Sequence, residues 1–186
     1  MALTLSTAII AVWCVASAFA QPLKIGYTNA EVVLSLMPEF KAMEQALKTH
    51  EQKLMQNMNV KKSYYESKVK EYQELLEGGK LVGDAKTKME ADIRKLEEEI
   101  QTYAEDAETN YNKKKEELIT PILDKLQKAI DEVAKEKGLT YIFNGSLAGN
   151  GIILHGPKQD NITLDLLKKL GIEPPKELLE ALQKTD

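Results

Sequence analysis

The chain has 186 residues, a net charge of −4, 29% charged residues and only 6% aromatic residues. Mild acidity, with both signs of charge mixed along the chain, excludes the basic footprint of a nucleic-acid-binding protein. Many charged and few aromatic side chains favour long exposed helices over a large globular core.

The first twenty residues carry no charged side chain and end in Ala18-Phe19-Ala20. This small-x-small pattern predicts a secretory signal peptide, residues 1–20, cut between Ala20 and Gln21. Cleavage would remove Cys14, the only cysteine, and would exclude disulfides and thiolate metal sites from the mature chain. Two alternatives stay open. The segment could be an uncleaved membrane anchor, although its apolar run is short for a membrane span. The chain could also be a lipoprotein acylated at Cys14, although Trp13 is a bulky residue to precede such a processing site.

Residues 21–38 are expected to form the first part of a small body. Residues 23–29 alternate apolar with small or polar side chains, as in a strand with one buried face. Thr28 or Asn29 can cap a short helix from Ala30 to about Leu36, and Pro38 suits the first turn of the next helix.

Residues 39–137 have the pattern of two long helices joined by a glycine-rich tip at residues 78–83. Apolar residues recur at steps of three and four on both sides of the tip, which predicts an antiparallel coiled-coil hairpin. In the first helix the expected seam residues are Phe40, Met43, Leu47, Leu54, Met58, Tyr65, Val69, Tyr72 and Leu76. In the second they are Met89, Ile93, Leu96, Ile100, Tyr103, Ala107, Leu118, Ile122, Leu126, Ile130 and Val133.

The second helix is expected to begin at the capping residue Asp84 and to end before Gly138, which follows a basic last turn. Pro121 should bend or break this helix, because proline cannot donate the intrahelical hydrogen bond. We therefore assign residues 39–120 to an arm and residues 121–171 to the second part of the body.

In that second part, residues 139–144 and 152–154 resemble two strands of a β-hairpin around Asn150-Gly151. Asp160 and Asn161 are expected to cap a short helix over residues 162–170, and residues 172–186 form a tail with about two helical turns. The fold class is thus α+β and mostly α. So small a sheet would leave its edges unpaired, which predicts that association of chains completes the body.

The sequence predicts no catalytic, cofactor or metal site. His50 lies on the predicted seam, and no second histidine is near it or near His155 in the chain. The carboxylates lie beside lysines at helical spacing, as on a solvated coiled-coil flank. Asn144 and Asn161 begin N-glycosylation sequons, a motif that is common by chance.

Soft and amphipathic side chains on the arm are the candidates for contact with other molecules. Met55, Tyr64 and Leu75 fall beside the predicted seam, and Leu81 and Val82 lie at the tip, where no partner helix is expected to cover them. Flexible Met and amphipathic Tyr on a charged rod suit weak contact with many partners.

Three segments together with the order of the elements resemble the OmpH/Skp family of periplasmic chaperones. They are Lys24-Ile25-Gly26-Tyr27-Thr28-Asn29, the run from Lys135 to Phe143, and Asp160-Asn161-Ile162-Thr163-Leu164-Asp165-Leu166-Leu167. The resemblance implies a jellyfish-like homotrimer in the periplasm, with helical arms around a cavity.

It also implies an ATP-independent holdase that binds unfolded outer-membrane β-barrel proteins, with no cofactor and no nucleic acid. The five contact candidates would then touch the client. Because the chain is acidic where well-known members are basic, only weak contact with a membrane surface is expected. The alternative function is a non-catalytic periplasmic coiled-coil spacer or adaptor, but its usual flanking domains are larger than these flanks.

Overall fold

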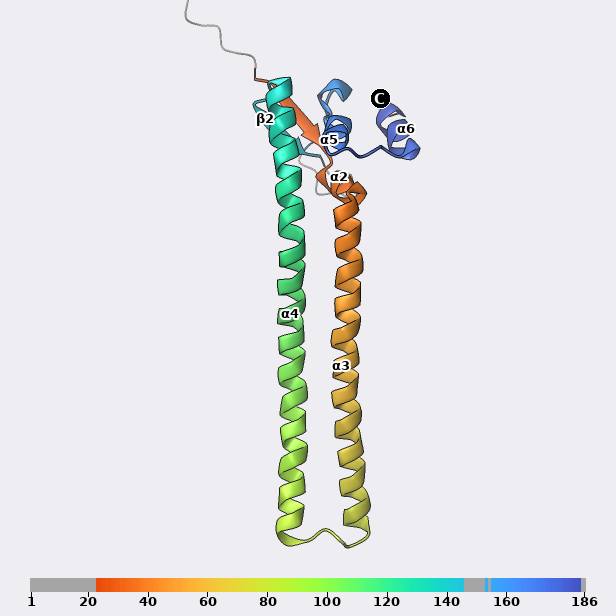
Figure 1. The fold of residues 1–186 in the computed structure, drawn as a ribbon, viewed down its shortest axis with the longest axis vertical. Coiled ribbons are helices and arrows are strands. Elements are labelled where there is room, and N and C mark those ends of the chain that lie inside the picture. Colours follow the sequence, from red (N-terminus) through yellow and green to blue (C-terminus); the bar gives the residue numbers. More distant parts are fainter. Residues whose placement is uncertain (1–22, 146–152, 154, 185–186) are drawn as a thin grey trace, which may run out of the picture.

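The computed structural model describes residues 23–145, 153 and 155–184. The predicted cleavage site between Ala20 and Gln21 lies outside these residues. A small body gathers at one end of the molecule, and two long helices project from it as a single arm (Figure 1). The mostly helical α+β architecture predicted from the sequence is confirmed.

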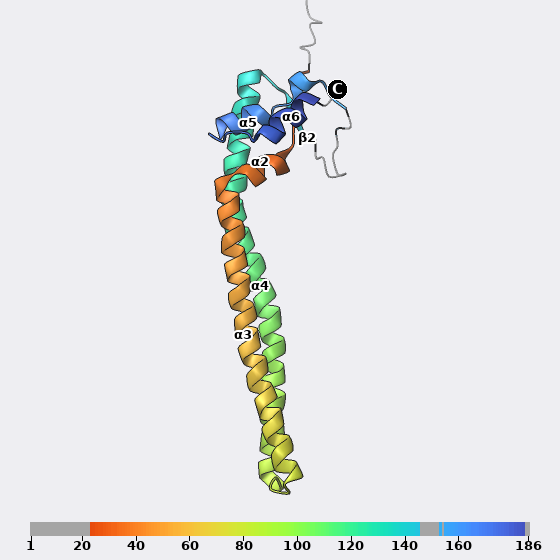
Figure 2. The same cartoon turned by 90° about the vertical axis from the view of Figure 1, so that its right-hand side faces the viewer.

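The arm consists of α3 (Pro38–Glu77) and α4 (Gly83–Lys137), which run antiparallel and side by side (Figures 1 and 2). With 40 and 55 residues, at 1.5 Å per residue, they are about 60 Å and about 80 Å long. The shorter helix leaves the body end of α4 free to pack against the other body elements (Figure 2).

The glycine-rich tip reverses the chain as predicted. Gly79 has φ of +63°, a left-handed conformation that glycine adopts without steric cost. The amide of Gly79 donates to the carbonyl of Leu76, and the amide of Lys80 donates to that of Leu75. This pair of bonds is a Schellman motif, which satisfies the last carbonyls of α3 and turns the chain toward α4.

Two details of α4 differ from the sequence-based expectation. The helix begins at Gly83, with Val82 as N-cap, so Asp84 lies in the first turn rather than at the cap. There its carboxylate still interacts favourably with the positive end of the helix dipole. The helix also continues through Pro121 to Lys137, so it is not broken there; proline removes one hydrogen bond, and the remaining turns hold the helix.

The sheet of the described residues has two strands, β1 (Ile25–Thr28) and β2 (Tyr141–Asn144), which pair in parallel. The described residues show no hairpin partner for β2. Ile153 belongs to no strand, and residues 152 and 154 lie outside the described part of the chain. Parallel strands need a long connection, and here the whole arm is that connection.

Short helices complete the body. α2 (Ala30–Leu36) is capped by the predicted Asn29, whose side chain accepts a hydrogen bond from the amide of Val32. Met37 is extended, as a residue before proline should be, and Pro38 begins α3.

At the other end of the chain come η1 (Lys158–Asp160), α5 (Thr163–Lys169) and α6 (Lys176–Lys184). The last of these confirms the short helix expected in the tail. The carboxamide oxygen of Asn161 accepts from the amide of Thr163, and that of Asn144 accepts from the amide of Ala30. Both sequon asparagines therefore hold the start of a neighbouring helix.

One hydrophobic core joins the two ends of the chain at the base of the arm. Its buried residues come from around α2, the start of α3, the end of α4 and around α5: Val33, Met37, Met43, Leu47, Ile122, Leu126, Ala129, Val133, Ile162, Leu166 and Leu167. The partly buried Leu178 of α6 packs against this core. The base of the arm is thus the well-packed part of the molecule.

Candidate functional site

Beyond its base, the arm is packed much more loosely than the body. Between residues 48 and 80, all of which are described, no side chain of α3 is buried, and between residues 84 and 121 none of α4 is. A two-helix hairpin covers each seam residue from one side only, so the rest stays in contact with solvent. The arm therefore offers apolar surface along a charged rod.

Tyrosine hydroxyl groups cross the seam where packing is thin. Tyr65 Oη donates to Glu97 Oε1 at 2.6 Å, and Tyr72 Oη donates to Glu90 Oε1 at 2.7 Å. Tyr103 Oη reaches the backbone carbonyl of Leu54 at 3.3 Å. These bonds tie α3 to α4 at three heights along the arm.

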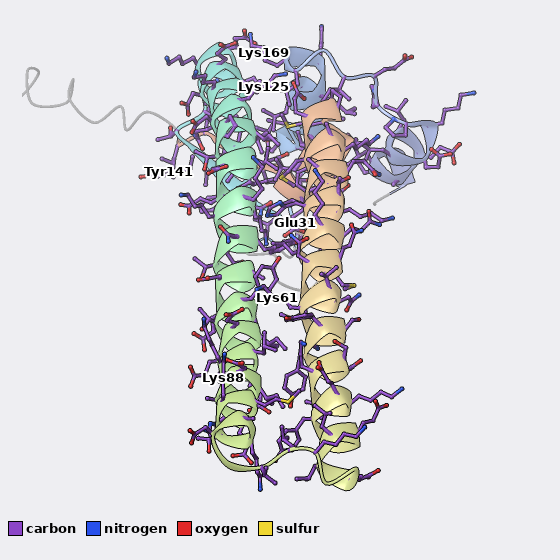
Figure 3. All side chains as sticks on the ribbon, turned by 60° about the horizontal axis from the view of Figure 1, so that its bottom comes forward. Glu31, Lys61, Lys88, Lys125, Tyr141 and Lys169 are labelled. Carbon is purple, nitrogen blue, oxygen red and sulfur yellow. The ribbon has the colours of Figure 1, made fainter. Side chains whose placement is uncertain are left out.

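A groove of about 190 Å³ lies between α3 and α4 at mid-arm. Four apolar side chains and two charged ones line it: Val60, Lys61 and Tyr64 from α3, and Leu96, Glu99 and Ile100 from α4. Figure 3 labels Lys61 about midway along the arm, between the two helices. We call this hollow the mid-arm groove.

The groove has a polar neighbour on the same side of the arm. A second hollow, of about 410 Å³, shares two charged residues with it, Lys61 and Glu99. The rest of its lining is mostly polar: Lys95, Glu98, Thr102, Tyr103 and Asp106. An extended chain lying along this side would meet an apolar recess and then a more polar one.

Lysines and tyrosines are paired around the mid-arm groove. Lys61 Nζ lies 3.8 Å from Glu99 Oε2 and 5.7 Å from the ring centroid of Tyr103. Lys68 Nζ lies 5.9 Å from the ring centroid of Tyr64 and donates to Glu71 at 2.7 Å. Lys61 and Lys68 are half-buried at positions where a seam residue would stand, because their stems lie along apolar surface while their ammonium groups reach solvent.

Three of the five predicted contact residues are exposed. Met55 is 59% exposed, Tyr64 53% and Val82 72%. Only Tyr64 lines the mid-arm groove. The other two stand apart from it, so the structure does not bring the predicted residues together into one site.

Leu75 does not stand beside the seam as expected. It is half-buried, while Leu76, the expected seam residue, is 43% exposed. The seam takes a step of three from Tyr72 to Leu75, which keeps the heptad, rather than the step of four assumed from the sequence.

Leu81 was expected to be uncovered at the tip, and this expectation is wrong. It is only 8% exposed, whereas its neighbour Val82 points into solvent. The Leu81 side chain is covered within this one chain. Leu81 therefore helps to close the hairpin.

Val60 was missed by the sequence reasoning, although it is 65% exposed and lines the groove. Its spacing of four from Tyr64 could have identified it, because residues one turn apart share a helix flank. Val60 and Tyr64 each precede a seam position, whereas Met55 follows the seam residue Leu54. Met55 therefore emerges on the opposite flank of α3.

Among the described residues, no group of three or more His, Cys, Asp or Glu side chains is placed to hold a metal ion. His50 is half-buried, and its Nε2 has no hydrogen-bond partner within the described structure. His155 is exposed. In the same part of the chain, no helix is both long and apolar enough to cross a membrane.

Comparison with known proteins agrees with this architecture. The model of the OmpH-like outer membrane protein family matches residues 24–170, which include the whole arm and the body up to α5. The chain is also 25% identical over 155 residues to the chaperone protein Skp of Yersinia enterocolitica, covering 83% of this chain and 90% of that protein. The tail helix α6 lies beyond the family match. The chain belongs to the OmpH/Skp family.

Proposed function

We propose that this protein is an ATP-independent, non-enzymatic holdase of the periplasm, which keeps unfolded outer-membrane proteins soluble. The observation that carries the proposal is the arm: a long two-helix rod that is charged overall yet leaves apolar side chains uncovered at mid-arm and at the tip. Family membership and the similarity to the chaperone Skp support it.

The mechanism needs no energy source. A protein that binds unfolded but not folded chains lowers the free concentration of the aggregating species by mass action. Many weak contacts along one arm give useful avidity without any tight site, and they release the client when insertion into a membrane competes.

We further propose that three chains associate through their bodies and hold their arms around one client. The described sheet has only two strands, and its side chains Ile25 and Tyr141 are 40% and 54% exposed. A two-stranded sheet is not stable alone, and pairing between chains would satisfy its edges. A folded monomer in sedimentation at micromolar concentration would contradict this assembly.

The rival function is a periplasmic spacer or adaptor, and an aggregation assay separates the two. A urea-unfolded outer-membrane β-barrel protein is diluted into buffer without ATP, and light scattering is followed with and without this protein. A holdase suppresses scattering at near-equal amounts of protein and client, whereas a spacer leaves the scattering unchanged.

A triple variant connects this activity with the arm. Replacing Met55, Tyr64 and Val82 by Ser should weaken suppression about tenfold, because three exposed apolar contacts are lost. The matched control replaces the exposed polar residues Gln52, Gln73 and Gln101 by Ser and should suppress as well as the parent. Equal suppression of aggregation by the two variants would show that these arm residues do not bind the client.

A further inference from the structure

We propose that the mid-arm groove is a subsite for aromatic side chains of the unfolded client, which it prefers to aliphatic side chains of equal size. The inference rests on the proposed holdase function and names the element of the client that the arm recognises. Shape, charge and accessibility of the groove each support it.

The apolar lining fits one six-membered ring. Val60 and Tyr64 lie one turn apart on α3, and Leu96 and Ile100 lie one turn apart on α4, so four apolar side chains surround the hollow. Its volume is about 190 Å³. An apolar cavity of about 150 Å³ is enough to bind benzene.

The charges at the groove distinguish an aromatic ring from an aliphatic group. Lys61 belongs to the lining of the groove, and its ammonium lies 5.7 Å from the ring centroid of Tyr103. The Lys68 ammonium lies 5.9 Å from the ring centroid of Tyr64, which is itself part of the lining. Lys61 is the cation of this lining, and its ammonium can meet the negative face of a further ring. The Glu99 carboxylate in the same lining can accept a hydrogen bond from a phenol or indole.

The groove is open to a client in the single chain. Val60 and Tyr64 are 65% and 53% exposed, on a helix whose other outward residues are mostly charged or polar. Membrane-spanning β-barrels carry girdles of aromatic residues at both interfaces. The unfolded chain of such a barrel therefore offers the side chain that the groove fits.

The test compares two unstructured peptides of about sixteen residues that differ only at four positions. One peptide carries phenylalanine there and the other cyclohexylalanine, which has a similar shape and greater hydrophobicity but no π face. Dissociation constants for the full-length protein are measured by fluorescence anisotropy of the labelled peptides. The expected result is tighter binding of the phenylalanine peptide by at least threefold.

Variants locate the preference at the groove. Lys61→Met keeps an apolar stem but removes the charge, so the preference should fall about two- to fivefold. Lys61→Arg should retain it, because a guanidinium also stacks on rings. Val60→Ser should weaken binding of the phenylalanine peptide. Met55→Ser, on the opposite flank of α3, should leave the ratio of the two dissociation constants unchanged. Circular dichroism confirms that each variant keeps its helices.

Two results would overturn the inference: equal or tighter binding of the cyclohexylalanine peptide, or a preference that survives both Lys61→Met and Val60→Ser. If the protein still suppresses aggregation of the unfolded β-barrel, only the aromatic subsite is wrong. If it binds neither peptide and suppresses no aggregation, the holdase function fails as well.

Discussion

Tyr65 and Tyr72 show how single residues hold a thinly packed arm together. Each hydroxyl donates to a glutamate on the opposite helix, at 2.6 and 2.7 Å. The hydrogen bond to Glu97, together with desolvation and the negative charge, raises the pKa of Tyr65 above 10.0. The bond to Glu90 raises the pKa of Tyr72 in the same way.

The raised pKa values make these bonds sensitive to alkali. A phenol donates its proton only while it is neutral, so the stabilisation is complete below the pKa of the unfolded phenol. It is lost as the pH rises through the raised pKa of the folded state. Thermal unfolding of the parent should therefore move to lower temperature above about pH 10.

Replacing Tyr65 and Tyr72 together by Phe should make this alkaline shift smaller and lower the melting temperature only slightly at pH 7. Thermal melting followed by far-UV circular dichroism between pH 7 and pH 11 gives both the alkaline shift and the melting temperature at pH 7. Lysine deprotonation affects parent and variant alike and cancels in the comparison. An identical alkaline shift in the two proteins would show that the tyrosine bonds do not stabilise the arm.

Single residues of the site were only partly predictable. The exposure of Met55 and Tyr64 follows from helical spacing, that of Val82 follows from its place at the tip, and all three are confirmed. Leu81 was missed because burial at a tight tip depends on how the loop folds back. Val60 was missed because the groove exists only when the flanks of two helices meet.

At the scale of the element, α4 shows that local propensity does not decide a helix end by itself. Pro121 lies inside the helix, where proline has no amide to donate to the carbonyl of Glu117. Ile122 and Leu126 follow at once and are buried in the core. Burial of these side chains outweighs the missing bond, so the helix continues.

Pro121→Ala should stabilise the protein by about 1–3 kcal/mol, because the missing intrahelical bond can form. Pro121 is exposed, so the smaller side chain opens no cavity. Urea unfolding followed at 222 nm measures the change, with the exposed Lys113→Ala as a control that should shift stability by no more than about 0.5 kcal/mol. A variant no more stable than the parent would mean that the helix already compensates for proline.

At the scale of the whole molecule, the buried core gathers at the body end, and most of the arm beyond it keeps its apolar side chains in contact with solvent. The core gathers residues from both chain ends, and the buried hydroxyls of Thr28 and Thr163 hydrogen-bond at 3.1 Å within it. Such a layout fixes the base of the arm and leaves its length free for contact.

Leu167→Ala should destabilise the body by about 2–5 kcal/mol, because the side chain is fully buried and its loss leaves a cavity. Leu164→Ala, on the same helix but 38% exposed, should cost less than about 1 kcal/mol. Urea unfolding of both variants provides the comparison. Equal losses would show that α5 is not part of the cooperative core.

The sequence by itself determined the arm. Steps of three and four set the two helices, and glycines set their ends, because helix periodicity and left-handed turns are local properties of the chain. Only the tertiary structure decided the pairing of β1 with β2, which are separated by the whole arm. It also decided the burial of Leu81 and the mid-arm groove. Strand pairing and grooves depend on which distant parts of the chain meet, and the local spacing of residues does not determine which parts those are.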